Sequence, residues 1–154
     1  MEENKPIKRH KDIQPLSRDH HHSLLLCWKI RKGFSKGVEL ERIKAYSDWF
    51  FLNHVQPHFR IEEEYMFPVL GNNHEMVKRA LAEHRRLERL FNEEKDIERS
   101  LSRIEEEMEQ HVRYEERELF NVIQQHATQE QLRLIAENHK DERFEDNTTD
   151  EFWK

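Results

Sequence analysis

Apolar residues recur at intervals of three and four along most of this chain, the spacing that places them on one face of an α-helix. Polar and charged residues fill the positions between them. The pattern predicts four helices, at about residues 17–33, 38–70, 74–92 and 97–126. Thr128 is a suitable N-cap for a short fifth helix that carries Leu132 and Ile135.

The expected helix ends depend on a few residues. Ser17 suits an N-cap and Gly33 a helix end. The sequence Gly71-Asn72-Asn73 predicts a turn, and Pro57 should kink the second helix or remove one of its backbone hydrogen bonds. Leu24, Leu25 and Trp28 are expected on the buried face of the first helix.

Long helices with short connections predict an all-α fold, an antiparallel up-down-up-down four-helix bundle with a short extra C-terminal helix. Three glycines and four prolines leave little room for the turns of a β fold. We expect an extended lead-in at residues 1–15, one bundle domain at residues 16–142 and an acidic tail at residues 143–154. Phe152 and Trp153 of this tail could dock on the bundle.

The composition narrows the function. Apolar residues make up 35% and charged residues 38% of the chain. The net charge of -6 does not favour nucleic-acid binding. The single cysteine, Cys27, excludes an intrachain disulfide and is expected in the core. No apolar stretch suits a signal peptide or a membrane span, so we expect a cytoplasmic protein without membrane contact. The eleven histidines are unusual for this length.

Two histidine-containing segments repeat 53 residues apart. Residues 58–70 read HFRIEEEYMFPVL, and residues 111–123 read HVRYEERELFNVI. Six of the thirteen positions are identical, including the histidine, both glutamates and the phenylalanine. A chance His-x-x-x-Glu spacing is common in a glutamate-rich helix, but two copies in matching frames favour a functional site.

The spacing within each segment favours metal binding. His and Glu four residues apart lie one turn apart on the same helix face, which here also carries apolar residues. Imidazole and carboxylate together suit iron, zinc or manganese. Burying these groups without partners would cost on the order of several kcal/mol per charge. A bound cation offsets this cost. The repeat therefore predicts four ligands: His58, Glu62, His111 and Glu115.

The other two helices each offer a histidine in apolar surroundings. His84 follows Leu81 and precedes Leu87, and His21 precedes Leu24, Leu25 and Trp28 at helical spacing. His21 is therefore preferred over its neighbour His20, which stays the close alternative. His54, one turn before His58, is a further candidate ligand, and Glu116 is a rival to Glu115. The remaining histidines near ends and turns, His10, His74, His126 and His139, are expected at the surface.

With these motifs the chain resembles the hemerythrin-like (HHE cation-binding) family, over about residues 16–126. The repeated segments carry the resemblance, and LSRDHHHSLLLCWKIRKG and ALAEHRRLERLF supply the supporting helices. Membership implies a four-helix bundle around two non-haem iron ions with an oxo or hydroxo bridge. His58 and His111 would then be terminal ligands, Glu62 and Glu115 would bridge, and His84 and His21 would complete the set.

The chain departs from the oxygen-carrying hemerythrins at two positions. They have a second histidine one turn from the third-helix histidine, where this chain has Ala80 and Glu88. They also use an aspartate five residues after the last histidine, where this chain has Glu116. The resemblance therefore fits better with members that sense or react with dioxygen, peroxide or nitric oxide, or that handle iron.

Other functions stay open on the sequence alone. A di-iron oxidase, peroxidase or nitric oxide reductase is one, a zinc site of His54, His58 and Glu62 is another, and a metal-free helical adaptor is a third. A ferritin-like di-iron bundle is disfavoured, because its Glu-x-x-His motif occurs nowhere in the chain. The physiological ligand would be a small molecule such as dioxygen, peroxide or nitric oxide, and the sequence names no protein partner.

Overall fold

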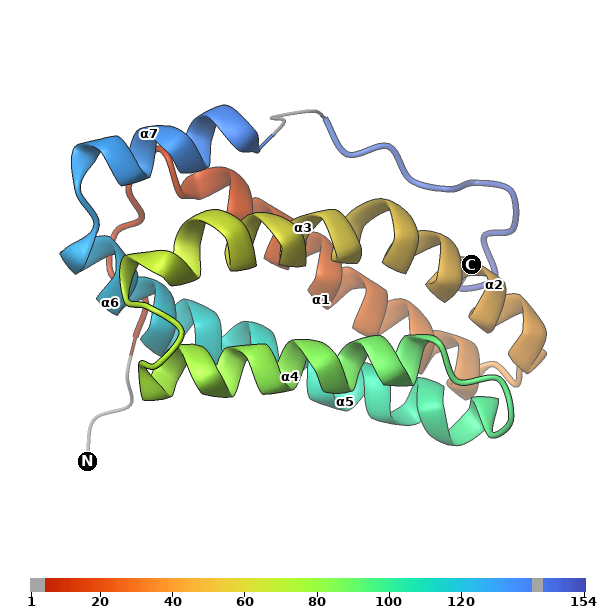
Figure 1. Cartoon of the computed structure of the whole chain (residues 1–154). Coiled ribbons are helices and arrows are strands. Elements are labelled where there is room, and N and C mark those ends of the chain that lie inside the picture. Colours follow the sequence, from red (N-terminus) through yellow and green to blue (C-terminus); the bar gives the residue numbers. More distant parts are fainter. Residues whose placement is uncertain (1–4, 140–142) are drawn as a thin grey trace.

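The computed structural model describes residues 5–139 and 143–154, and all regular structure within these ranges is helical (Figure 1). The expected all-α class is therefore confirmed. The α-helices are α1 (Gln14–Ser35), α2 (Leu40–Phe50), α3 (Gln56–Ile61), α4 (Glu75–Phe91), α5 (Ile97–Tyr114), α6 (Phe120–His126) and α7 (Gln129–Asn138).

Short non-α turns join several of these helices into longer rods. The π-helical turn η1 (Phe51–Val55) links α2 to α3, which continues through the π-helical turn η2 (Glu62–Met66) and the 3-10 turn η3 (Phe67–Val69). A third π-helical turn, η4 (Glu115–Leu119), links α5 to α6. In Figure 1 the chain runs from left to right through α1, back through α2 and α3, to the right again through α4 and back through α5 and α6, so successive rods are antiparallel.

Pro57 lies in the first turn of α3, directly after η1. A proline inside a helix lacks a backbone N–H and clashes with the preceding turn, and the wider π-helical turn before Pro57 accommodates it. The expected irregularity is therefore a change of helix type ahead of the proline. Thr128 caps α7 as expected, in a capping box with Gln131.

The first helix differs from the expectation at both ends. It begins at Gln14 and places Pro15 in its first turn, where the missing N–H breaks no helical bond. Ser17 lies inside the helix, and its hydroxyl donates to the Glu116 carboxylate at 3.0 Å. Gly33 does not end the helix. A Cβ there would come within 2.7 Å of Ile43 and 2.9 Å of Phe152, so the glycine permits close packing.

The buried face of α1 also differs from the expected one. Leu16, His20, Ser23, Cys27 and Ile30 are buried, at intervals of three and four. Leu25 and Trp28, which were expected inside, are 37% and 48% exposed.

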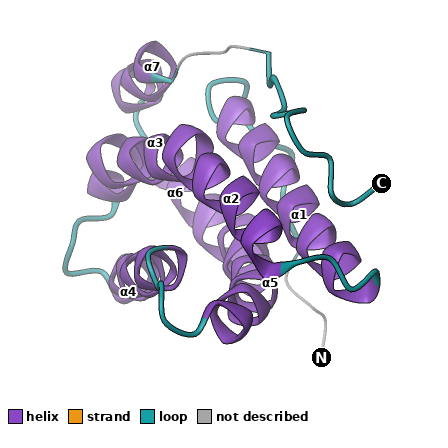
Figure 2. Cartoon of the chain, turned by 90° about the vertical axis from the view of Figure 1, so that its right-hand side faces the viewer, coloured by secondary structure: helices purple, strands orange, loops and turns teal. Residues whose placement is uncertain are grey.

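Two apolar clusters fill the bundle, one toward each end. The first joins parts of α1, α2, α4 and α5 with Phe152 and Trp153, which dock as the tail packs against the bundle. The second joins the start of α1, η2, α4, α6 and α7, and α7 lies outside the four main rods (Figure 2). The ring of Trp153 covers the Lys29 ammonium, which pairs with Asp146 at 2.5 Å. In the described part of the chain, every helix is too short or too polar to cross a bilayer.

Candidate metal centre

Six buried polar side chains gather between the two apolar clusters, and each of the four rods contributes at least one. All six are at most 6% exposed: His20 from α1, His58 from α3, Glu62 from η2, His84 from α4, His111 from α5 and Glu115 from η4. So many ionisable groups in a core are unfavourable unless they are paired or bind a metal.

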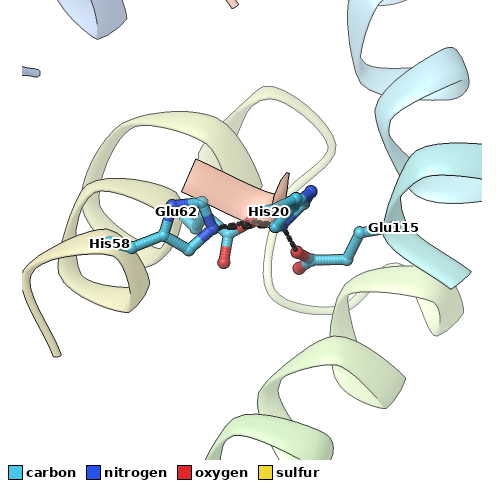
Figure 3. Close-up of side chains that lie close together, drawn as sticks. All are labelled: His20, His58, Glu62 and Glu115. Carbon is cyan, nitrogen blue, oxygen red and sulfur yellow. Dashed lines mark hydrogen bonds and ion pairs between the residues drawn. The ribbon is translucent and has the colours of Figure 1, made fainter. Parts of the chain in front are cut away.

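The six side chains form two overlapping groups of four. One contains His20, His58, Glu62 and Glu115 (Figure 3), and the other contains His84 and His111 with the same two glutamates. Within each group, the candidate ligand atoms lie within 4.8 Å of one another. Glu62 and Glu115 belong to both groups, so each offers one carboxylate to two neighbouring positions.

The distances between the inner atoms are short on both sides. His20 Nε2 lies 3.0 Å from Glu115 Oε1 and 3.1 Å from His58 Nε2. His58 Nε2 lies 3.2 Å from Glu62 Oε2. In the second group, His84 Nε2 lies 3.0 Å from Glu62 Oε1, and His111 Nε2 lies 3.4 Å from Glu115 Oε1. All four imidazoles therefore turn Nε2 toward the carboxylates.

Several of these inner atoms have no hydrogen-bond partner among the described residues. They are both oxygens of Glu62, Oε2 of Glu115, and Nε2 of His84 and His111. An unpartnered buried polar atom costs about 1–3 kcal/mol, and more when it is charged. Nitrogen and oxygen atoms that face one another without hydrogen bonds fit a divalent cation between them. The residues present therefore suit a metal pair.

The outer nitrogen of each imidazole also faces a carboxylate. The pairs are His58 Nδ1 with Asp19 at 2.8 Å, His84 Nδ1 with Glu63 at 2.7 Å, His111 Nδ1 with Glu83 at 2.7 Å, and His20 Nδ1 with Glu116 at 3.3 Å. In metal sites, a carboxylate on the far nitrogen fixes the tautomer and the orientation of a histidine ligand. Four such carboxylates leave each Nε2 directed inward.

The contacts follow an approximate twofold symmetry. Asp19 directly precedes His20 and orients His58 of the next rod. In the same way, Glu83 directly precedes His84 and orients His111 of the next rod. The second glutamate of each Glu-Glu pair orients a histidine in the other half, as Glu63 does for His84 and Glu116 for His20. The two halves of the bundle, α1 with α3 and α4 with α5, thus carry equivalent sets of residues.

Both shared carboxylates lie at the first residue of a π-helical turn. Glu62 begins η2 and Glu115 begins η4, and each carbonyl accepts a bond from the N–H five residues later. π-Helical turns inside α-helices are rare and concentrate at functional sites. The two turns occupy the same position in the repeated segments, so the repeat extends to the backbone.

In the metal-free site, the imidazoles and the carboxylates shift one another's pKa values. Burial opposes the protonated form of His20, but hydrogen bonds to Glu115 and Glu116 outweigh it and raise the pKa of His20 to about 9. Burial also opposes ionisation of Glu115, yet the charge of His111 and the hydrogen bond from His20 hold the pKa of Glu115 well below its usual range. Protons on imidazoles thus balance buried carboxylates, and bound cations could replace them.

Two histidine predictions need correction. His21 is exposed on the outer side of α1, and His20 takes the expected place. His54 belongs to neither group that the described residues form, because its ring packs against Trp49 and Phe144. The hypothesis of a zinc site of His54, His58 and Glu62 therefore has no geometric support.

Among the expected surface histidines, His139 also differs. Its Nε2 contacts Asp19 at 2.7 Å, and its side chain is only 12% exposed.

Sequence reasoning missed the four orienting carboxylates as a set. Glu116 was considered only as a rival ligand to Glu115. Two signals in the sequence point to them: an acidic residue directly before His20 and His84, and a second glutamate after Glu62 and Glu115.

Comparison with known families identifies the class of protein. Residues 11–95, more than half of the chain, match the model described as hemerythrin HHE cation binding domain. The chain belongs to this family. Comparison with curated proteins and with solved structures gave no match. The family match ends before His111 and Glu115, so the repeated segment and the structure, and not the family match, join these two residues to the rest of the centre.

Proposed function

We propose that this protein holds two iron ions, one in each four-residue group, and binds a small ligand such as dioxygen, peroxide or nitric oxide. The sharing of Glu62 and Glu115 between both groups carries the proposal. Each ion would receive two imidazoles and one oxygen from each shared carboxylate. Four protein donors leave open positions on an ion that accepts more than four ligands, and iron there would supply redox and ligand-binding chemistry.

The donor set narrows the choice of metal, and the resemblance to hemerythrin-like di-iron proteins favours iron within it. Mixed imidazole and carboxylate ligands suit iron, manganese and zinc, whereas magnesium and calcium prefer oxygen alone. Structural zinc is usually tetrahedral with four protein ligands and binds no further ligand. Sensing, storage or turnover of the small ligand would all use this centre.

The first experiment counts the metal and follows its reaction with air. Protein reconstituted anaerobically with ferrous iron should contain two irons per chain by elemental analysis. Exposure to air should then produce ligand-to-metal charge-transfer absorption in the near-ultraviolet and visible range. Protein that binds fewer than one iron, or whose iron-loaded spectrum is unchanged by air, would contradict the proposal.

The orienting carboxylates predict a graded effect on affinity. Glu83→Gln leaves every inner ligand in place but replaces the carboxylate on His111 Nδ1 with a neutral amide. Loss of such a partner weakens metal affinity by about 10- to 100-fold. Competition with a chelator of known affinity measures the change. Glu75→Gln on the same helix is the matched control, because the Glu75 side chain is 89% exposed. Equal affinities for the two variants would refute an orienting role.

A further inference from the structure

The segment before α1 lies against α6. It comprises residues 5–10, here called the arm, and it passes α6 before the chain turns into α1 (Figure 1). Asn121 of α6 binds the backbone of the arm at two points. Its Oδ1 accepts a hydrogen bond from the N–H of Ile7 at 3.0 Å, and its Nδ2 donates to the carbonyl of Lys5 at 2.8 Å. One side-chain amide thus satisfies a donor and an acceptor of the main chain.

Gln124, three residues further along α6, repeats this arrangement. Its Oε1 accepts a hydrogen bond from the N–H of His10 at 2.9 Å, and its Nε2 donates to the carbonyl of Lys8 at 2.7 Å. In both cases the two backbone groups belong to residues that are two positions apart. The face of α6 therefore recognises the arm through its backbone.

The arm is held weakly. Residues 5–8 are exposed, and the apolar side chain of Ile7 among them is 37% exposed. Three of the four backbone hydrogen bonds with α6 also face solvent. A segment with few buried apolar contacts and solvent-exposed hydrogen bonds opens at a small cost in free energy. We therefore expect the arm to detach while the bundle stays folded, as far as Ile13, which is fully buried.

Arg9 is the arm side chain that reaches into the bundle, and it is only 8% exposed. Its guanidinium donates to Asn121 Oδ1 at 3.0 Å and to the backbone carbonyl of Glu116 at 2.6 Å. It also lies 3.9 Å from the Glu116 carboxylate and 5.6 Å from the centroid of the Phe120 ring. Docking of the arm thus brings a positive charge to Glu116 and Phe120.

Both of these residues contact His20, one of the six candidate ligands. The Glu116 carboxylate faces His20 Nδ1 at 3.3 Å, and the Phe120 ring stacks on the imidazole at a centroid distance of 5.1 Å. Ser17 donates to the same carboxylate at 3.0 Å. The docked arm therefore supports the two groups that fix the orientation of this imidazole.

The other half of the centre has a similar cation without the arm. There Glu63 faces His84, and Arg85, the residue directly after His84, pairs with the Glu63 carboxylate. The equivalent position in α1 is His21, which is exposed. The cation beside the carboxylate comes from α4 itself in one half, whereas Arg9 supplies it from a separate segment in the other.

We propose that the arm is a detachable strap, and that Arg9 is a positioning residue which couples its docking to the metal affinity of the half formed by His20 and His58. With the arm docked, Glu116 and Phe120 hold His20 in its binding orientation. Detachment removes the cation from both. The inference rests on the proposed function, because it concerns the same metal centre. The coupling is reciprocal, so bound metal must strengthen docking of the arm by the factor that docking adds to metal affinity.

Limited trypsin digestion of the full-length protein, followed by mass spectrometry, measures detachment, because Lys8 and Arg9 are cleavage sites within the arm. Cleavage that requires local opening follows the population of the open form. Anaerobic loading with ferrous iron should slow cleavage in the arm about fivefold or more, at the lower end of common coupling factors. Cleavage at Lys95, in the exposed turn between α4 and α5, is the internal control and should not change. Equal arm cleavage with and without iron, in protein that holds two irons, would overturn the proposal.

Substitutions in α6 detach the arm without changing a candidate ligand or an orienting carboxylate. Replacing both Asn121 and Gln124 with alanine removes all four backbone hydrogen bonds. Cleavage of the arm should become about tenfold faster or more. Competition with a chelator should show one iron bound about fivefold more weakly and the other unchanged. Gln125→Ala, an exposed neighbour on the same helix, is the matched control and should alter neither. Unchanged iron affinity in the double variant would contradict the coupling.

Arg9→Gln tests the coupling itself, because it keeps the backbone hydrogen bonds of the arm. It should weaken one iron about fivefold and remove the effect of iron on cleavage after Lys8. Arg9→Lys keeps the charge beside Glu116 without the paired donors, so it should recover part of the affinity. An equal loss for both irons would indicate general destabilisation and would refute the role of Arg9. Failure of the proposed function is distinguishable, since the unaltered protein would then bind fewer than one iron.

Discussion

Loading the metal-free protein with ferrous iron should raise its unfolding temperature by about 10 °C or more. Iron that binds the folded chain and not the unfolded one stabilises it by about 4 kcal/mol per site at a free concentration 1,000 times the dissociation constant. For a chain of about this length, each kcal/mol shifts the midpoint by about 2–4 °C. Anaerobic thermal unfolding, followed by circular dichroism with and without iron, measures the shift.

The controls for this experiment separate specific from general ion effects. Magnesium prefers oxygen ligands and retains its waters, so it should shift the midpoint far less than iron. A chelator added to the iron-loaded protein should return the midpoint to that of the metal-free protein. Identical midpoints with iron, magnesium and chelator would instead favour the metal-free adaptor considered from the sequence.

The repeated helices were predictable because two kinds of information agree in them. The spacing of His58 and Glu62 defines one helix face, and the second copy at His111 and Glu115 repeats the frame. A single copy would have carried little weight in a chain with 32 acidic residues. The π-helical turns that begin at both glutamates were not predictable, because helical spacing alone gives no sign of a five-residue turn.

The first helix shows where pattern analysis fails. Residues 24–28 read Leu-Leu-Leu-Cys-Trp, and five successive apolar residues point in every direction around a helix. Such a run does not indicate which face of the helix is buried, so helical phase does not separate His20 from His21. The packing of α1 against α5 decides which face of α1 is buried, because that contact buries Cys27 and leaves Trp28 exposed. The Trp28 that led to His21 is thus a surface residue.

The orienting carboxylates depend on contacts between distant parts of the chain. Asp19 meets His58 39 residues away and His139 120 residues away. A sequence pattern describes the faces of single helices, but it does not give the rotation or the height of one helix relative to another. These interhelical positions decide which of many acidic residues faces an imidazole.

The last prediction distinguishes shared ligands from ligands of one ion. Glu62→Gln and Glu115→Gln should each reduce the iron content of the desalted protein from two to nearly none. The affinity for iron should fall by more than about 100-fold, a larger loss than the removal of an orienting carboxylate causes. Each replaces an anionic ligand of both groups with a neutral amide. His58→Gln, in contrast, should lose one iron and keep the other, because His58 belongs to one group only.

The matched control for this set is Glu64→Gln, an exposed neighbour of Glu62 on the same turn, which should keep both irons. Circular dichroism of each metal-free variant shows whether the bundle has folded before its iron is counted. The comparison between the glutamate and histidine variants carries the argument, since general destabilisation would reduce iron content in all of them alike. One retained iron in Glu62→Gln would mean that this carboxylate serves a single ion. The approximate twofold symmetry of the residues would then not extend to the metal pair.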